Sequence, residues 1–291
     1  MKIFLSWYAN PPDPPYWLWI RDLDGLLVSL HSLRGGILDA AALKGLKRYI
    51  GFSKILIVDS LPHSLFNNPD VYVNSLQSLV LYAQRILGAD ILVHRDIPLV
   101  RAYENRKEEL LKRTMLNAEH ALKVAERLGV DVMLVVQGWD PESYARCADY
   151  YRGLGVRYAA IGSLVPRRGN PRFVEMIVKL VREVLGKNVY IHLLGVANPR
   201  IAVALARHID SVDISTPIKA AVAREVLVEV NGMLKRVHLS TLGEEQLYKL
   251  LKNANKDLAE GLMKAKRMRD VIRLIALYNA HTLISWIKKN T

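Results

Sequence analysis

The sequence predicts an α/β protein built as a (β/α)8 TIM barrel. Short apolar runs rich in β-branched residues alternate with longer segments of helical periodicity, a pattern typical of βα units around a parallel sheet. Eight such alternations fit into about 230 residues, a length that suits a closed barrel. We therefore expect a barrel domain at residues 1–235 and a basic helical extension, packed on the barrel, at residues 236–291.

The predicted strands are short and mostly apolar. They cover residues 2–7, 25–30, 54–58, 90–94, 131–136, 157–161, 188–193 and 211–214. Helices are predicted between these strands and after the last one, at residues 38–49, 71–87, 103–128, 141–154, 171–185, 199–208 and 219–230. Asp140, Asn170 and Asn198 each precede a proline, which places an N-cap before the first helical position. Helix ends are marked by Gly88, Gly129, Gly155 and Gly186.

After residue 240 the alternation stops, and residues 243–289 are predicted to form two or three basic helices. Lys264, Lys266, Arg267, Arg269 and Arg273 crowd one segment that also contains apolar residues. One helix face can then pack on the barrel, while the other faces solvent or anions. The extension is interpreted as a helical cap or a dimer face.

The charge balance is strongly basic. Lysine and arginine number 41 and aspartate and glutamate 28, which gives a net charge of +13 and a pI near 9.7. Such an excess attracts polyanions, so a nucleic-acid partner is expected, with salt-dependent binding. A basic proteome or a hot habitat would produce the same balance.

The single cysteine, Cys147, excludes an intramolecular disulfide and a cysteine-rich zinc site. We interpret it as a small buried hydrophobic residue on a helix. The amino terminus has no apolar run long enough for a signal peptide, and polar residues interrupt every apolar stretch before membrane-spanning length. A cytoplasmic protein with no membrane partner is expected.

Polar residues follow the predicted strands at the ends that surround the mouth of a barrel. They are Asp59, Asp96, Gln137, Gly162, Ser163, Gly195 and Asp213. Each one alone could be a helix N-cap. Three carboxylates converging on one mouth would perturb one another's pKa values, an arrangement more typical of catalysis than of stability.

Several motifs, in the same order along the chain, resemble those of the tRNA-guanine transglycosylases, most closely the archaeal branch. The motifs are Asp59-Ser60, Asp96-Ile97-Pro98, Val136-Gln137-Gly138, Gly162-Ser163-Leu164-Val165-Pro166, His192-Leu193-Leu194-Gly195 with Asn198-Pro199, and Asp210-Ser211-Val212-Asp213 with Pro217. The resemblance extends from residue 59 to residue 217 and implies an enzyme on a TIM barrel.

The resemblance also implies a reaction. Asp213 would attack C1′ of a target guanosine and form a covalent aspartyl-ribosyl intermediate, which an incoming 7-deazaguanine base then resolves. Asp59 would protonate the departing purine and deprotonate the incoming one. The target nucleotide would be flipped out of its stack, in tRNA or in DNA.

Other residues would bind the substrate. Asp96 and Gln137 would read the Watson–Crick edge of the base, while the backbone of Gly162, Ser163 and Leu164 approaches it closely because Gly162 has no side chain. Arg167, Arg168 and Arg172 would contact the nucleic-acid backbone, or lie on a solvated loop.

The sequence also departs from the family pattern. Leu61-Pro62-His63-Ser64 replaces Gly-Gly-Phe-Gln after Asp59-Ser60, and one cysteine cannot supply the family's zinc site of three cysteines and a histidine, so neither zinc nor another cofactor is expected. Residues 236–291 are too few for the RNA-binding domains of the archaeal tRNA enzymes. A short, zinc-free chain is similar to the DNA-guanine transglycosylases, and members of the family often form homodimers.

Two further functions remain open. A non-catalytic paralogue or partner subunit would bind nucleic acid without a covalent adduct. A nucleosidase or glycoside hydrolase would use the same carboxylates with water in place of the incoming base. His192, within an apolar strand, is interpreted as a core histidine rather than a catalytic residue.

Overall fold

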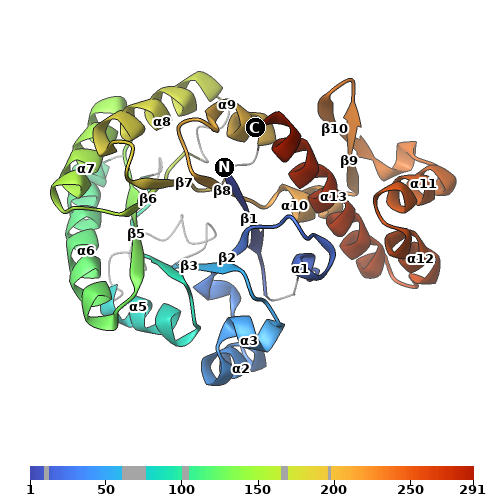
Figure 1. Ribbon diagram of the computed structural model, residues 1–291, viewed down its shortest axis with the longest axis horizontal. Coiled ribbons are helices and arrows are strands. Elements are labelled where there is room, and N and C mark those ends of the chain that lie inside the picture. Colours follow the sequence, from blue (N-terminus) through green and yellow to red (C-terminus); the bar gives the residue numbers. More distant parts are fainter. Residues whose placement is uncertain (10–12, 61–76, 100–104, 165–169, 196–197) are drawn as a thin grey trace.

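The computed structural model describes residues 1–9, 13–60, 77–99, 105–164, 170–195 and 198–291. Within these segments, parallel strands close into one eight-stranded barrel in the order of the sequence (Figure 1). The strands are β1 (Lys2–Trp7), β2 (Gly25–Ser29), β3 (Ile55–Asp59), β4 (Ile91–Val93), β5 (Asp131–Val136), β6 (Tyr158–Ile161), β7 (Tyr190–Leu193) and β8 (Ser211–Ile214). Because β8 pairs in parallel with β1, the predicted TIM barrel is confirmed.

Helices surround the barrel in the alternation that the sequence predicts. They are α1 (Tyr16–Trp19), α2 (Gly36–Lys44), α3 (Leu46–Ile50), α5 (Gln77–Ile86), α6 (Lys107–Leu128), α7 (Pro141–Gly153), α8 (Pro171–Leu185), α9 (Pro199–Leu205) and α10 (Thr216–Val222). Two short 3-10 turns cover Leu30–Ser32 and Leu239–Thr241. The predicted helix at 38–49 is divided at Gly45, whose φ of 78° ends α2. Residues 71–76 of the predicted helix at 71–87 lie outside the described residues.

The predicted helix starts are confirmed by their caps. The Asp140 carboxylate accepts a hydrogen bond from Ser143 N at 2.8 Å, and Asn170 and Asn198 accept from Phe173 N and Arg200 N in the same way. Each cap is followed by proline at the first helical position, where a missing N–H costs no hydrogen bond. These caps fix the points at which the chain leaves the mouth of the barrel.

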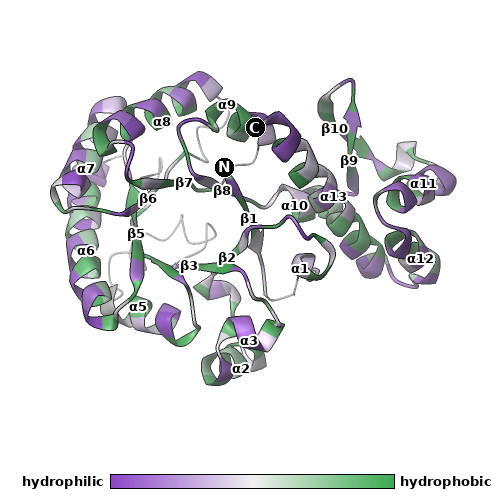
Figure 2. Ribbon diagram, viewed as in Figure 1, coloured by the Kyte–Doolittle hydropathy of each residue, from purple (hydrophilic) through white to green (hydrophobic). Residues whose placement is uncertain are grey.

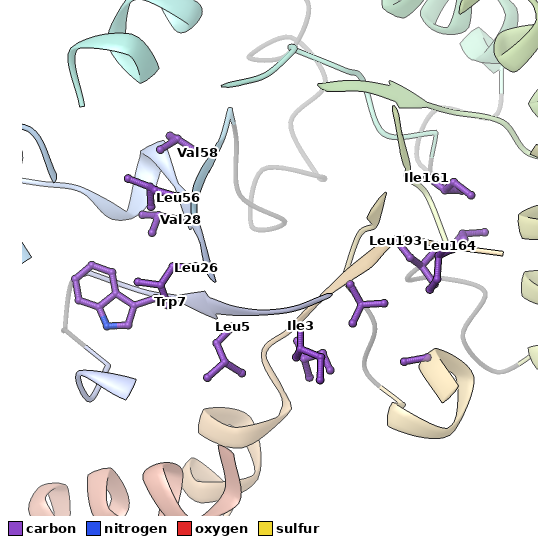
Figure 3. Packing of buried hydrophobic residues seen from close by; sticks show 14 of the residues in the cluster. Ile3, Leu5, Trp7, Leu26, Val28, Leu56, Val58, Ile161, Leu164 and Leu193 are labelled. Carbon is purple, nitrogen blue, oxygen red and sulfur yellow. The ribbon is translucent and has the colours of Figure 1, made fainter. Parts of the chain in front are cut away.

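Hydrophobic residues fill two layers. Leu5, Leu26, Val28, Leu56 and Val58 point away from the barrel axis, toward the surrounding helices (Figure 3). The helices themselves alternate between hydrophobic and hydrophilic residues along their length, as expected when one face packs and the other meets solvent (Figure 2). Cys147 is fully buried in this outer layer, as predicted.

A second, smaller cluster fills the lumen and includes Phe4, Ile57, Val135 and Ala160. Side chains two residues apart on a strand share a face. The next lumen-facing positions toward the carboxyl ends of these strands are Ser6, Asp59, Gln137 and Gly162, where polar residues and a glycine replace the hydrophobic ones. The alternation of the strands therefore brings polar groups to the mouth above an apolar plug.

The predicted helix at 219–230 is wrong beyond residue 222. α10 ends at Val222, and β9 (Glu225–Val230) and β10 (Met233–His238) form an antiparallel hairpin. Val226, Val228 and Val230 alternate with other residues at the period of a strand, and Asn231-Gly232 supplies the two positive φ angles, 52° and 75°, of a tight hairpin turn. The boundary expected between residues 235 and 236 falls inside β10.

Three helices follow the hairpin, namely α11 (Glu244–Ala254), α12 (Lys256–Lys264) and α13 (Met268–Asn290). α13 packs against α9, α10 and β9, so the extension is tied to the barrel along this helix (Figure 1). Lys264, Lys266, Arg267 and Arg269 are exposed. Among the described helices, none is both long enough and apolar enough to cross a bilayer.

Asn279 joins α13 to the hairpin and to α10. Its buried side chain accepts a hydrogen bond from Leu227 N at 2.8 Å and donates to Glu225 O at 3.0 Å and Pro217 O at 3.3 Å. We expect Asn279→Ala to lower the free energy of unfolding by about 3 kcal/mol, because it leaves a buried backbone N–H without its acceptor. Asn290→Ala, at the exposed end of the same helix, is the control. Equal urea midpoints for the two variants would contradict this role.

Candidate active site

The polar residues of the mouth lie at the carboxyl ends of the strands, as predicted. Asp213 is the third residue of β8 and Asp59 the last of β3, while Asp96, Gln137 and Gly162 follow β4, β5 and β6. The charges of Asp96 and Asp213 both act on the Asp59 carboxyl group. The sequence therefore predicted correctly that these carboxylates meet in one site.

Asp213 is buried and held by three hydrogen-bond partners. Its Oδ1 accepts from Gly195 N at 2.7 Å and lies 3.3 Å from His192 Nε2, and its Oδ2 accepts from Ser6 Oγ at 2.7 Å. Burial alone would raise its pKa, but the hydrogen bonds and charge of His192, with those from Gly195 and Ser6, outweigh burial and hold the pKa below its ordinary value. Asp213 is therefore a buried, oriented carboxyl group whose surroundings favour the ionised form.

His192 is a residue of this site that the sequence interpretation assigned to the core. It is fully buried, as predicted, with its ring edge-on to Phe4 at 5.8 Å between centroids. Its Nε2 faces Asp213, and its Nδ1 lies 2.7 Å from Ser211 Oγ. The signal lay in the strand alternation, since His192 and Asp213 are lumen-facing residues on neighbouring strands and His192 pairs in register with Ser211.

Asp59 has the opposite electrostatic environment. Its Oδ1 accepts a hydrogen bond from Ser60 N at 2.7 Å. Burial raises its pKa well above the ordinary value, the charges of Asp96 and Asp213 raise it further, and the bond from Ser60 only partly offsets them. The pKa values of two carboxyl groups of one site are thus shifted in opposite directions, that of Asp213 downward and that of Asp59 upward.

Gln137 and Asp96 form a hydrogen-bonded pair beside these carboxyls. The Gln137 side chain is buried and donates through Nε2 to Asp96 Oδ2, while its Oε1 has no hydrogen-bond partner among the described residues. Burial raises the pKa of Asp96 to about 6, against the opposing effect of the bond from Gln137. A buried amide oxygen without a partner is costly, so this pair is suited to a ligand that brings donors.

The β6 loop approaches this pair through Gly162. A Cβ atom at Gly162 would lie 2.5 Å from Gln137 Nε2 and 2.8 Å from Val135 Cγ1, so only glycine fits without a shift. Gly162 O accepts a hydrogen bond from Tyr144 OH at 2.8 Å, and Ser163 Oγ accepts one from Leu99 N at the same distance. Leu164 is buried. Of the three predicted loop residues, Gly162 therefore lies against Gln137, Ser163 holds the chain after β4 through Leu99, and Leu164 packs in the outer hydrophobic layer.

The chain is similar in sequence to known proteins. The sequence model of a family described as queuine tRNA-ribosyltransferase (TGT) matches residues 30–288. The chain belongs to this family. It is also similar to the tRNA-guanine(15) transglycosylase of Methanocaldococcus jannaschii, with 29% identity over 174 residues. The match covers 56% of this chain and 26% of that relative, so the chain spans about a quarter of the relative's length.

The three arginines expected to contact a nucleic-acid backbone are placed only in part. Arg167 and Arg168 lie outside the described residues. Arg172 is exposed in the first turn of α8 and lines a shallow surface hollow with Glu175 and Lys179. Among the described residues, no hydrogen bond or ion pair joins Arg172 to the aspartates of the mouth.

The residues of this TGT-family chain do not fit a zinc site of three cysteines and a histidine. Cys147 is the one cysteine of the sequence, and it is buried on α7 between the barrel and the helices. Among the described residues, no group of three or more histidine, cysteine, aspartate or glutamate side chains is arranged to hold a metal ion.

Proposed function

We propose that the protein exchanges guanine in tRNA for a 7-deazaguanine base through a covalent intermediate on Asp213. The observation that carries the proposal is the contrast between two carboxyl groups of the mouth. Asp213 is held by Gly195, Ser6 and His192, which lower its pKa, whereas burial and the charges of Asp96 and Asp213 raise the pKa of Asp59. A nucleophile and an acid with separated pKa values are what the displacement of a purine requires. The family description and the relative's name both refer to tRNA, which supports this polymer over DNA.

In the proposed first step, a carboxylate oxygen of Asp213 attacks C1′ of the target nucleotide. The C1′–N9 bond breaks, its electron pair leaves with guanine, and the proton of Asp59 neutralises the departing base. The hydrogen bonds from Gly195 and Ser6 keep the attacking carboxylate oriented before attack.

In the second step, N9 of the incoming base loses its proton to Asp59 and attacks C1′. The bond between C1′ and Asp213 breaks, and both carboxyl groups return to their starting protonation. Asp96, once ionised, accepts hydrogen bonds from N1–H and the amino group of the base, and the unpartnered Gln137 Oε1 offers a further acceptor. The proposal includes the cytoplasmic location expected from the sequence, since tRNA is present there.

The test is a trapping assay with the wild-type protein, labelled tRNA and labelled DNA, each with and without a 7-deazaguanine base. The proposal expects a denaturation-resistant adduct with tRNA and incorporation of the base. Asp39→Asn, an exposed carboxyl on α2, is the control and should behave as wild type. Release of free guanine without incorporation of the base would identify a hydrolase. Binding without an adduct would identify a non-catalytic protein, and an adduct with DNA alone would identify a DNA-modifying enzyme.

Gly162→Ala should weaken binding of the base. The added methyl group must displace the Gln137 amide from Asp96, so we expect the Kd for guanine to rise roughly tenfold, the scale of one lost hydrogen bond. Calorimetric titration with guanine measures this directly. Gly153→Ala, where a Cβ meets no atom within 4 Å, is the matched control. If Gly162→Ala bound guanine with the affinity of wild type, the assignment of Gln137 to the base-binding site would be wrong.

A further inference from the structure

A cavity of about 330 Å³ lies where the carboxyl-terminal extension meets the barrel. Its walls come from the starts of α9 and α10, the β9–β10 hairpin and the middle of α13, which Figure 1 shows close together at one side of the barrel. None of the residues assigned above to the reaction lines it. The cavity is therefore distinct from the site of the aspartates.

The cavity adjoins the nucleophile. Thr216, which lines it, is the third residue after Asp213, so their Cα atoms are at most about 11 Å apart. Asn198, also in the wall, is the third residue after Gly195, whose N–H binds the Asp213 carboxylate. A polymer with one nucleotide at Asp213 would bring a neighbouring nucleotide to this cavity.

The floor of the cavity is apolar. Leu227 and Leu283 are buried, and Leu234 and Pro199 complete the surface. Such a surface can hold the flat face of a nucleobase, because stacking and burial favour every base regardless of its hydrogen-bonding edge.

The rim carries two guanidinium groups, from Arg200 and Arg236. Arg200 is exposed, and its guanidinium has no ion-pair partner among the described residues. Arg236 pairs with Glu225 at 3.2 Å through one nitrogen and leaves its other N–H groups available, with its side chain 48% exposed. Two forked donors beside an apolar floor match the phosphate and the base of one nucleotide unit.

We propose that this cavity binds a nucleotide adjacent to the target in the substrate RNA strand, with its base on the leucine floor and its phosphate on Arg200 and Arg236. The proposal rests on the proposed function, since it assumes a nucleic-acid strand at Asp213. It assigns to the hairpin and α13 a binding role beside their structural one.

The test is equilibrium binding of a fluorescent RNA stem–loop carrying the target guanine, measured by anisotropy. Arg200→Ala and Arg236→Ala should each raise the Kd roughly tenfold. Each should also reduce the slope of log Kd against log salt by about 1, the contribution of one phosphate contact. Leu234→Trp fills the cavity without changing charge, and should weaken binding of this RNA but not of an RNA with abasic sites beside the target. Lys187→Ala, an exposed lysine before β7 at the opposite end of the barrel, is the control.

The proposal is overturned if the arginine variants and Leu234→Trp bind as Lys187→Ala does, with thermal melting confirming that each is folded. It is equally overturned if Leu234→Trp weakens both RNAs alike, because the floor would then not hold a base. Binding is measured without turnover, so the two proposals can fail separately. If these variants bind RNA more weakly but the wild type forms no adduct, the cavity is a nucleotide-binding site and the proposed reaction is rejected.

Discussion

Asp213→Asn is expected to lower kcat/KM for base exchange by roughly 10⁴-fold or more, the scale of loss when an enzyme's nucleophile is removed. Asparagine retains the size of aspartate; its Oδ1 can still accept from Gly195 N, and its amide nitrogen can donate to Ser6 Oγ in place of the bond that the hydroxyl donated. It has no negative charge with which to attack C1′. The covalent adduct should therefore disappear from denaturing gels, while the affinity for tRNA stays within a few-fold of wild type.

Asp210→Asn is the matched control, because it changes the other carboxylate of the same four-residue motif. Asp210 pairs with Arg182 at 2.6 Å and accepts from Ile191 N, so its loss should lower thermal stability rather than remove the adduct. A persistent adduct in Asp213→Asn would contradict the assignment of the nucleophile.

Asp59→Asn should reduce kcat by roughly 10²- to 10⁴-fold, the usual contribution of a general acid. The variant should also change the pH profile. Burial and the charges of Asp96 and Asp213 raise the pKa of Asp59, so the protonated form that acts on the departing base is present below that raised pKa and is lost as pH rises through it. The alkaline limb of the wild-type profile therefore belongs to Asp59 and should vanish in the variant.

The acidic limb has a different origin and should remain in Asp59→Asn. Asp96 must be ionised to accept from the base, and its pKa of about 6 means that this form is lost as pH falls below about 6. Rates measured from pH 5 to pH 9 for both proteins provide the comparison. If the alkaline limb of the pH–rate profile persists in Asp59→Asn, the general acid is a group other than Asp59.

The strand pattern was sufficient to predict the barrel and the convergence of Asp59, Asp96 and Asp213. In a closed parallel barrel, the residues that end the strands must share one mouth, whatever the loops do. The same reasoning failed at residues 225–230, where a strand with valines at alternate positions was predicted to be part of a helix. The two strands of a hairpin follow each other directly, so the alternation of strand and helix that made the other strands recognisable is interrupted there.

Contacts that depend on three-dimensional register could not be predicted. Ser6 reaches Asp213 across the β1–β8 pair, and His192 reaches it across the β7–β8 pair. The distribution of protonation between Asp59 and Asp213 likewise depends on which donors surround each carboxyl group. The cavity beside the hairpin was hidden for the same reason, since its walls come from segments more than 80 residues apart in the chain.

The bond between Ser6 and Asp213 lies on the seam that closes the barrel, and it joins residues 207 positions apart. Pairing of β1 with β8 is the longest-range strand contact of the fold, and such contacts carry the greatest loop-closure entropy. During synthesis, the first strand must wait for the last before the carboxylate acquires its hydroxyl partner. A chain that has not completed its barrel therefore lacks the hydrogen bond that orients Asp213, so under the proposed function the nucleophile is assembled only when the fold is complete.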